Sequence, residues 1–147
     1  MGTIIELYEA MQKLNIREKV PELIVKTKYE LILKVQNQHV FGLNGTGNKI
    51  TPSYAGKLYS QFKASLNPSA GYGIPDVKVT GAYNDGMSLK IEGDNYVIDS
   101  DVSYAQSASI NQYGNSLNLP TDQSKGEYWN EVLAPEIIDY IKEETGL

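Results

Sequence analysis

Two neighbouring runs, MSLKIEG at 87–93 and NYVIDS at 95–100, restrict the fold of this chain more than any other segment. Each run alternates apolar and polar residues, which is typical of a β-strand with one buried face. The sequence EGDN between them has the residue types of a tight hairpin turn. A third run, VKVTG at 77–81, alternates in the same way. We therefore predict a small antiparallel sheet over about 77–100.

Helical periodicity dominates the chain before the strands. The N-terminal helices are predicted over about 3–40, because apolar residues recur there at helical intervals. The first covers about 3–15, and the second covers about 21–39 with Pro21 in its first turn. A further helix is predicted over about 53–66, where apolar residues recur at every fourth position: Tyr54, Leu58, Phe62 and Leu66.

The chain after the strands is also predicted to be helical, over about 101–145. A short helix begins near Asp101, whose carboxylate suits a helix N-cap, and a loop follows it. The last helix contains Pro135, so it has to kink there or divide in two. This order predicts one α+β domain over 1–147, with a small antiparallel sheet flanked by N-terminal and C-terminal helices.

The composition fits a globular domain without a membrane-spanning segment. Of the 147 residues, 41% are hydrophobic and 21% are charged, and no apolar run approaches the length of a membrane span. Residues 1–50 carry seven basic and five acidic side chains, a net of +2, whereas residues 51–147 carry six and thirteen, a net of −7. The acidic part disfavours tight binding to a nucleic-acid backbone, which needs clustered cations.

Residue types that perform catalysis or bind metals are scarce. The chain has one histidine, His39, and no cysteine, which leaves no donor set for zinc. His39 is predicted to pack or cap at a helix end. Asp94, Asp99 and Asp101 cluster around one strand, but a calcium site needs more oxygen ligands, and whether they bind an ion stays open. We expect no metal and no cofactor.

The sequence GLNGTGNK at 42–49 matches a phosphate-binding loop only in part. The second glycine of such a loop directly precedes a lysine, whereas Asn48 intervenes here, and the loop follows a predicted helix and not a strand. We interpret the segment as a flexible turn, or as an ordered loop that contacts a partner.

Tyrosine is the prevalent aromatic residue, with eleven Tyr against two Phe and one Trp. A tyrosine buries its ring while its hydroxyl reaches a polar group, which suits surfaces that are buried against other proteins. The alternative is that many of them lie half-buried at the rim of a small core.

Residues 77–114 read VKVTGAYNDGMSLKIEGDNYVIDSDVSYAQSASINQYG. This segment resembles the tailed-phage virion morphogenesis family, whose members are also called tail-completion, neck or head–tail connector proteins. The matching residues are Val79, Thr80, Gly81, Tyr83, Tyr104, Ala105, Asn111, Gln112, Tyr113 and Gly114. Asn111 stands where the family usually has histidine, and the tyrosine-to-glycine spacing is longer here. FGLNGTGNKI and the ETGL end are also similar to small virion proteins of crAss-like phages.

The resemblance implies a non-enzymatic structural protein of the virion, assembled in the bacterial cytoplasm and acting without cofactors. Several copies would form a ring that joins portal-side proteins to tail proteins. DNA would pass through the channel without specific binding, and the acidic residues of 51–147 would prevent its adhesion.

The family supplies the location of the motif, and the residue types suggest what each position does. Subunit contacts are expected at the motif residues Thr80, Gly81, Tyr83, Tyr104, Ala105, Gln112, Tyr113 and Gly114. Thr80-Gly81 would form a turn, and Gly114 would end the short helix. Loops that reach a neighbour in the ring are expected at 42–53, 67–76 and 115–126.

Two other classes of function stay open from the sequence. A virion surface-binding or decoration module, either fibre-associated or carbohydrate-binding, would also use a tyrosine-rich surface and Gly/Asn loops. A small hydrolase would use Asp99 or Asp101. Position in the particle separates the first class from a neck ring, and turnover of a substrate identifies the second.

Overall fold

A computed structural model describes residues 4–77, 82–93, 95–102 and 111–146 of the chain. It has a small α+β fold in which helices accompany a two-stranded antiparallel sheet, as predicted. Several predicted features lie outside the described residues. They are the strand-like run after Val77, the Thr80-Gly81 turn, Asp94, Tyr104, Ala105 and most of the short helix after Asp101.

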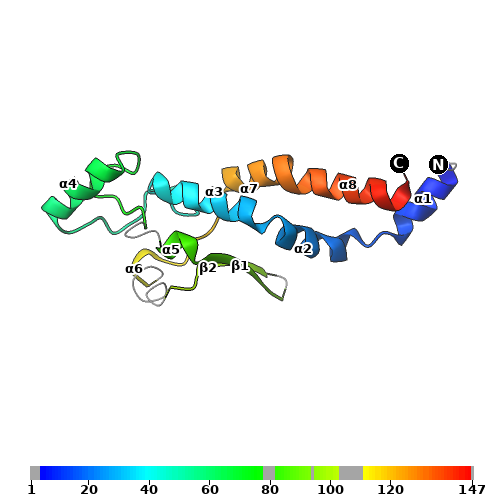
Figure 1. Ribbon diagram of the computed structural model, residues 1–147, viewed down its shortest axis with the longest axis horizontal. Helices are drawn as coiled ribbons and strands as arrows, with labels where there is room; N and C mark the ends of the chain where they lie inside the picture. Colours follow the sequence, from blue (N-terminus) through cyan, green and yellow to red (C-terminus); the bar gives the residue numbers. More distant parts are fainter. Residues whose placement is uncertain (1–3, 78–81, 94, 103–110, 147) are drawn as a thin grey trace.

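Two long helical segments lie side by side and run in opposite directions (Figure 1). The first consists of α2 (Ile16–Lys26) and α3 (Lys28–Val40), and the second consists of α7 (Asp122–Tyr128), a π-helical turn η2 (Trp129–Leu133) and α8 (Ala134–Thr145). Helix α1 (Ile4–Lys13) packs on α8 at the end where both termini lie.

Helix α2 begins five residues before the predicted start at Pro21. The Asn15 side chain caps it by accepting a hydrogen bond from Glu18 N at 3.2 Å. Asn15 and Glu18 therefore have the spacing of a capping box, and this local signal outweighs the preference of proline for a first turn. Pro21 consequently lies inside the helix.

The predicted helix over 21–39 is interrupted at Thr27, which separates α2 from α3. The Thr27 hydroxyl donates to Leu23 O at 2.8 Å, four residues earlier. A threonine that bonds back in this way tends to bend a helix. The hydroxyl of Thr27 also shares a hydrogen bond with Tyr128 OH, so the interruption contacts the opposite helical segment.

The C-terminal helix begins at Asp122, within the stretch predicted as loop. Thr121 caps it, since its hydroxyl accepts a hydrogen bond from Ser124 N at 3.1 Å. The predicted disturbance at Pro135 is confirmed: η2 precedes it, and the proline takes one of the first positions of α8. A π-turn is one of the ways in which a helix accommodates an irregularity without ending.

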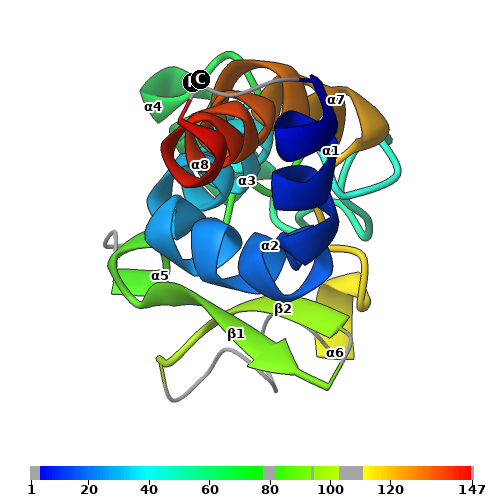
Figure 2. The same cartoon turned by 90° about the vertical axis from the view of Figure 1, so that its right-hand side faces the viewer.

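The predicted hairpin is confirmed. Strands β1 (Met87–Glu92) and β2 (Asn95–Ser100) pair antiparallel, with Glu92 opposite Asn95. Gly93 has a positive φ of 63°, which a tight turn demands and glycine allows. The hairpin lies against the face of α2 and α3 that is turned away from α8 (Figures 1 and 2). A short helix α5 (Ala82–Asp85) precedes it, and α6 (Asn111–Tyr113) follows it.

The hydrophobic core lies between the hairpin and the helical segments. Buried residues come from both halves of the chain, so each half depends on the other: Leu23, Ile24, Leu31, Ile32, Val35, Ile50, Tyr83, Met87, Leu89, Ile98, Leu117, Tyr128 and Leu133. Helix α4 (Lys57–Leu66) stands apart from this core, at the end of the molecule opposite α1 (Figure 1). None of the described helices is long and apolar enough to cross a membrane.

Candidate protein-binding surface

Helix α4 turns its apolar side to solvent and its polar side to the protein. Leu58, Phe62 and Leu66 are 83%, 57% and 66% exposed, whereas Ser60 and Lys63 are buried. Gly56 lies at the start of the helix and Asn67 at its end, so Asn67-Pro68 stops it as predicted, while the predicted start at 53 is too early. An amphipathic surface helix ordinarily buries its apolar stripe, so this orientation is the reverse of the usual one.

A buried ion pair holds α4 in this orientation. Lys63 Nζ lies 2.7 Å from Asp76 Oδ1, and the two side chains are only 8% and 5% exposed. Asn67 Nδ2 donates to Asp76 Oδ2 at 3.1 Å and to Val40 O at 2.7 Å. These bonds join the polar face and the end of α4 to the loop before Val77 and to the end of α3. We call the outward residues Leu58, Tyr59, Phe62 and Leu66 the α4 face.

Aromatic residues support the base of the α4 face. The rings of Tyr54 and Tyr59 meet edge to face with centroids 4.9 Å apart, and Tyr59 lies 6.4 Å from Phe62. Burial raises the pKa of Tyr54, and the nearby Asp76 carboxylate raises it further. Burial also raises the pKa of Tyr113, with additional contributions from Tyr59 and Asp76.

The sequence-predicted contact residues do not gather at one surface. Tyr83 is 1% exposed, and its hydroxyl bonds Asn118 while its carbonyl accepts from Ser100 Oγ at 2.8 Å. The expectation that Tyr83 contacts another subunit is therefore wrong, because its side chain lies inside the core. Gln112 is exposed, and Thr80, Gly81, Tyr104 and Ala105 lie outside the described residues.

Gly114 ends α6 with a φ of 92°, which confirms its predicted role at a helix end. Tyr113, expected as a subunit contact, is partly buried and packs against the core.

The three segments predicted to reach a neighbour contain residues that pack on the body or on each other. A Cβ atom added to Gly42 would lie 2.5 Å from the Ile74 side chain. A Cβ atom added to Gly45 would lie 2.5 Å from Leu119 Cβ, and Gly45 N donates to Ser116 O at 2.7 Å. Segment 42–49 is accordingly an ordered loop closed by a β-bridge between Leu43 and Lys49.

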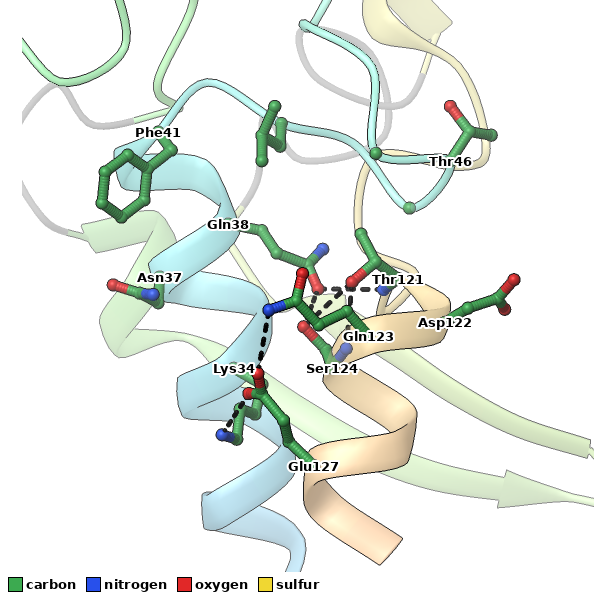
Figure 3. Close-up of a pocket in the computed structure, with 13 residues that line it drawn as sticks. Lys34, Asn37, Gln38, Phe41, Thr46, Thr121, Asp122, Gln123, Ser124 and Glu127 are labelled. Carbon is green, nitrogen blue, oxygen red and sulfur yellow. Dashed lines mark hydrogen bonds and ion pairs between the residues drawn. The ribbon is translucent and has the colours of Figure 1, made fainter.

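A polar groove of about 540 Å³ lies between α3, the 43–47 loop and the start of α7 (Figure 3). Gln38 Oε1 accepts from Thr121 N at 3.0 Å and from Ser124 Oγ at 2.7 Å. Lys34 Nζ donates to Glu127 Oε2 at 2.7 Å, and this bond raises the pKa of Lys34 and lowers that of Glu127. These polar side chains bond one another and thereby tie α3 to α7.

His39 occupies the last turn of α3, as predicted, and is fully buried. Its Nε2 lies 2.8 Å from Leu117 O, so Nε2 carries the proton and donates it to the carbonyl. Burial lowers the pKa of His39, which outweighs the opposing effects of the Leu117 carbonyl and Asp76. The ring is thus neutral at pH 7 and serves packing, with its edge towards Tyr83.

We expect His39 to make the fold sensitive to mild acid. Because the folded pKa is below the unfolded value, the unfolded chain binds a proton more readily, and stability is lost as pH falls below about 6.5. The free energy of unfolding should decrease by up to about 1 kcal/mol between pH 7 and pH 5.5, as the unfolded chain takes up the proton. Urea titrations of the wild type and of His39→Gln measure this change; an equal decrease in both would contradict it.

The aspartates at the end of the second strand and directly after it make local backbone contacts. Asp99 Oδ1 accepts from Ser100 N at 2.8 Å, and Asp101 N donates to Gly86 O at 3.1 Å. Within the described ranges, no three His, Asp or Glu side chains come together as a possible metal site. The predicted capping of a following helix by Asp101 falls on residues outside these ranges.

The pair that orients α4 was not found from the sequence. Ser60 and Lys63 have the polar character of a solvent face, and Asp76 lies thirteen positions beyond Lys63 in a loop. No periodic pattern connects them. The four-residue spacing of Leu58, Phe62 and Leu66 indicated the helix and its apolar side. It did not indicate the direction in which that side points.

No protein-family model, curated protein or solved structure matches this chain. The fold class and the outward α4 face therefore define the molecule structurally as a small α+β protein with an exposed apolar helix.

Proposed function

We propose that this chain is a non-enzymatic structural subunit that binds other protein chains, and specifically a neck or tail-completion protein of a tailed phage. It would form a ring in the virion between portal-side and tail-side components. The resemblance of residues 77–114 to the virion morphogenesis family supplies the specific role. The observation that carries the proposal is the outward α4 face.

The α4 face is costly for an isolated monomer. Burying Leu58, Phe62 and Leu66 in a contact would contribute about 1.5–3 kcal/mol for each side chain. The fold instead buries Lys63 and Asp76, which requires desolvation of two charges. A contiguous exposed apolar patch marks a site of interaction with protein more often than it serves the monomer.

The solvent-accessible surface of the chain is larger than that of a compact monomer. The accessible surface is 9275 Å² for a chain of 16.3 kDa, whereas a compact monomer of this mass exposes about 7,500 Å². The difference of roughly 1,800 Å² compares with about 800 Å² lost by each partner in one interface of standard size. The molecule thus exposes more surface than a compact monomer of its mass, in keeping with its elongated shape.

The charge distribution allows an acidic surface towards DNA. Lys26 and Lys34 of the first helical segment are paired with Glu136 and Glu127 of the second, so part of the positive charge of residues 1–50 is neutralised within the subunit. Glu143 and Glu144 at the end of α8 are exposed. In a ring whose channel wall is formed mainly by the acidic part, DNA would be repelled and would pass without adhesion.

Localisation in the particle tests the proposed function. We expect an amber mutation in the gene for this chain to yield DNA-filled heads and free tails that do not join, with rescue by the wild-type chain supplied in trans. Electron cryomicroscopy of intact particles should show the chain at the junction of portal and tail. Density on the capsid surface or on fibres would favour a decoration module instead, and absence from purified particles would end the proposal.

A further inference from the structure

The geometry points to a head-to-tail contact in which α1 of one copy binds the α4 face of the next copy. This inference rests on the proposed role as a ring subunit and specifies how neighbouring copies meet. It commits to a second copy of the chain as the occupant of the α4 face.

Helix α1 has the matching apolar surface. Ile4, Ile5 and Tyr8 are 85%, 69% and 61% exposed, although α1 packs on α8. These residues, with the exposed Gln12, share one side of the helix at 100° per residue. We call Ile4, Ile5, Tyr8 and Gln12 the α1 face.

Helices α1 and α4 lie at opposite ends of the long axis of the molecule (Figure 1). Both helices have ten residues, which corresponds to about 15 Å of contact length for each. A surface at one end that fits a different surface at the other end gives a heterologous contact, and such contacts form rings when the rotation closes. The placement therefore suits repetition of the same contact from copy to copy.

Charge favours α1 over a second α4 as the occupant. Helix α4 has no acidic residue, and its exposed lysine is Lys57, since Lys63 is buried and paired with Asp76. Helix α1 carries Glu6 and Glu9 against one lysine, Lys13. An α4–α4 contact would bring like charges together and would leave the α1 face exposed. An α1–α4 contact covers both apolar faces and places opposite net charges side by side.

Directed cross-linking tests the contact, since the chain has no cysteine of its own. Gln12→Cys and Ser65→Cys place thiols on exposed positions of α1 and α4 without removing an apolar side chain. With a short bismaleimide at high protein concentration, the mixture of the two single variants should give dimers. The double variant should give a ladder of higher multimers, because each copy then has both ends of the contact.

The controls separate this contact from its alternatives. Lys90→Cys, on an exposed position of β1, replaces Gln12→Cys in a matched mixture and should give at least about fivefold less dimer. Dimers from Ser65→Cys alone in equal yield would overturn the inference in favour of an α4–α4 contact. A yield no higher than that of the Lys90→Cys mixture would overturn it as well.

Charge reversal provides an independent measurement. Lys57→Glu should lower the cross-linking yield by about threefold, and combining it with Glu9→Lys should restore the yield. If the chain is located at the neck but Gln12→Cys and Ser65→Cys do not cross-link, the contact is overturned and the proposed function stays intact. A cross-link in a chain absent from particles supports the contact while the proposed function fails.

Discussion

Replacing Leu58 and Phe62 together by glutamate is expected to reduce the yield of infectious particles by at least about a hundredfold. The few residues that dominate an interface contribute about 2 kcal/mol or more each, and the loss of two such residues suffices for this decrease. Stability should stay within about 0.5 kcal/mol of the wild type, because both side chains are already exposed in the free subunit. Plaque counts and urea titrations measure the two quantities.

Leu33→Glu is the matched control for this pair of substitutions. Leu33 on α3 is 57% exposed, the same fraction as Phe62. Leu33→Glu therefore introduces one glutamate, against two in the α4 variant, at an apolar position as exposed as Phe62. We expect particles carrying Leu33→Glu to assemble at a higher yield than those carrying the α4 substitutions. If Leu33→Glu and the α4 variant reduced the particle yield equally, the α4 face would have no special role.

The largest effect on stability is expected from Asp76→Ala. It leaves the Lys63 ammonium buried without its carboxylate, and breaking a buried pair in this way costs about 3–5 kcal/mol. A domain of this size is typically stable by about 5–15 kcal/mol, so the loss is a large part of the total. The midpoint of urea unfolding, with its slope checked for two-state behaviour, reports the change.

Two variants test the cause of this loss. The double variant Lys63→Met, Asp76→Leu removes both charges and should recover most of the stability, since apolar pairs often replace buried ion pairs without loss. Lys57→Met removes an exposed lysine from the same helix and should change the free energy of unfolding by less than about 0.5 kcal/mol. A cost below about 1 kcal/mol for Asp76→Ala would show that the ion pair does not hold α4.

Local patterns account for the parts of the fold that were predicted from the sequence. The strand alternation and the Gly93 turn define the hairpin, because both depend only on neighbouring residues. The helix starts at Asn15 and Thr121 also have local causes, yet a proline and a loop-like composition concealed them. At Thr27, the bond back to Leu23 O is local, but the bond to Tyr128, about a hundred residues away, is one that no local pattern reports.

The candidate surface was harder to predict than the fold for a related reason. Periodicity shows that Leu58, Phe62 and Leu66 share a side of a helix, but the direction of that side depends on Lys63 and Asp76. The motif resemblance predicted a subunit contact at Tyr83, which is instead a core residue. The Tyr83 hydroxyl accepts a hydrogen bond from the buried Asn118 side chain. A tyrosine at this motif position therefore has a structural role in the core, because buried polar groups need a partner.

The interruptions of the two helical segments lie at the same level of the molecule, because Thr27 in one is hydrogen-bonded to Tyr128, directly before η2, in the other. Helices α1, α2 and α8 lie on one side of this level, and α3 and α4 lie on the other (Figure 1). In a head-to-tail assembly, the angle between the two ends of a subunit determines how far each copy is rotated from the last. In the proposed ring, the bend at Thr27 and Tyr128 would therefore be the element of the monomer that sets the number of copies.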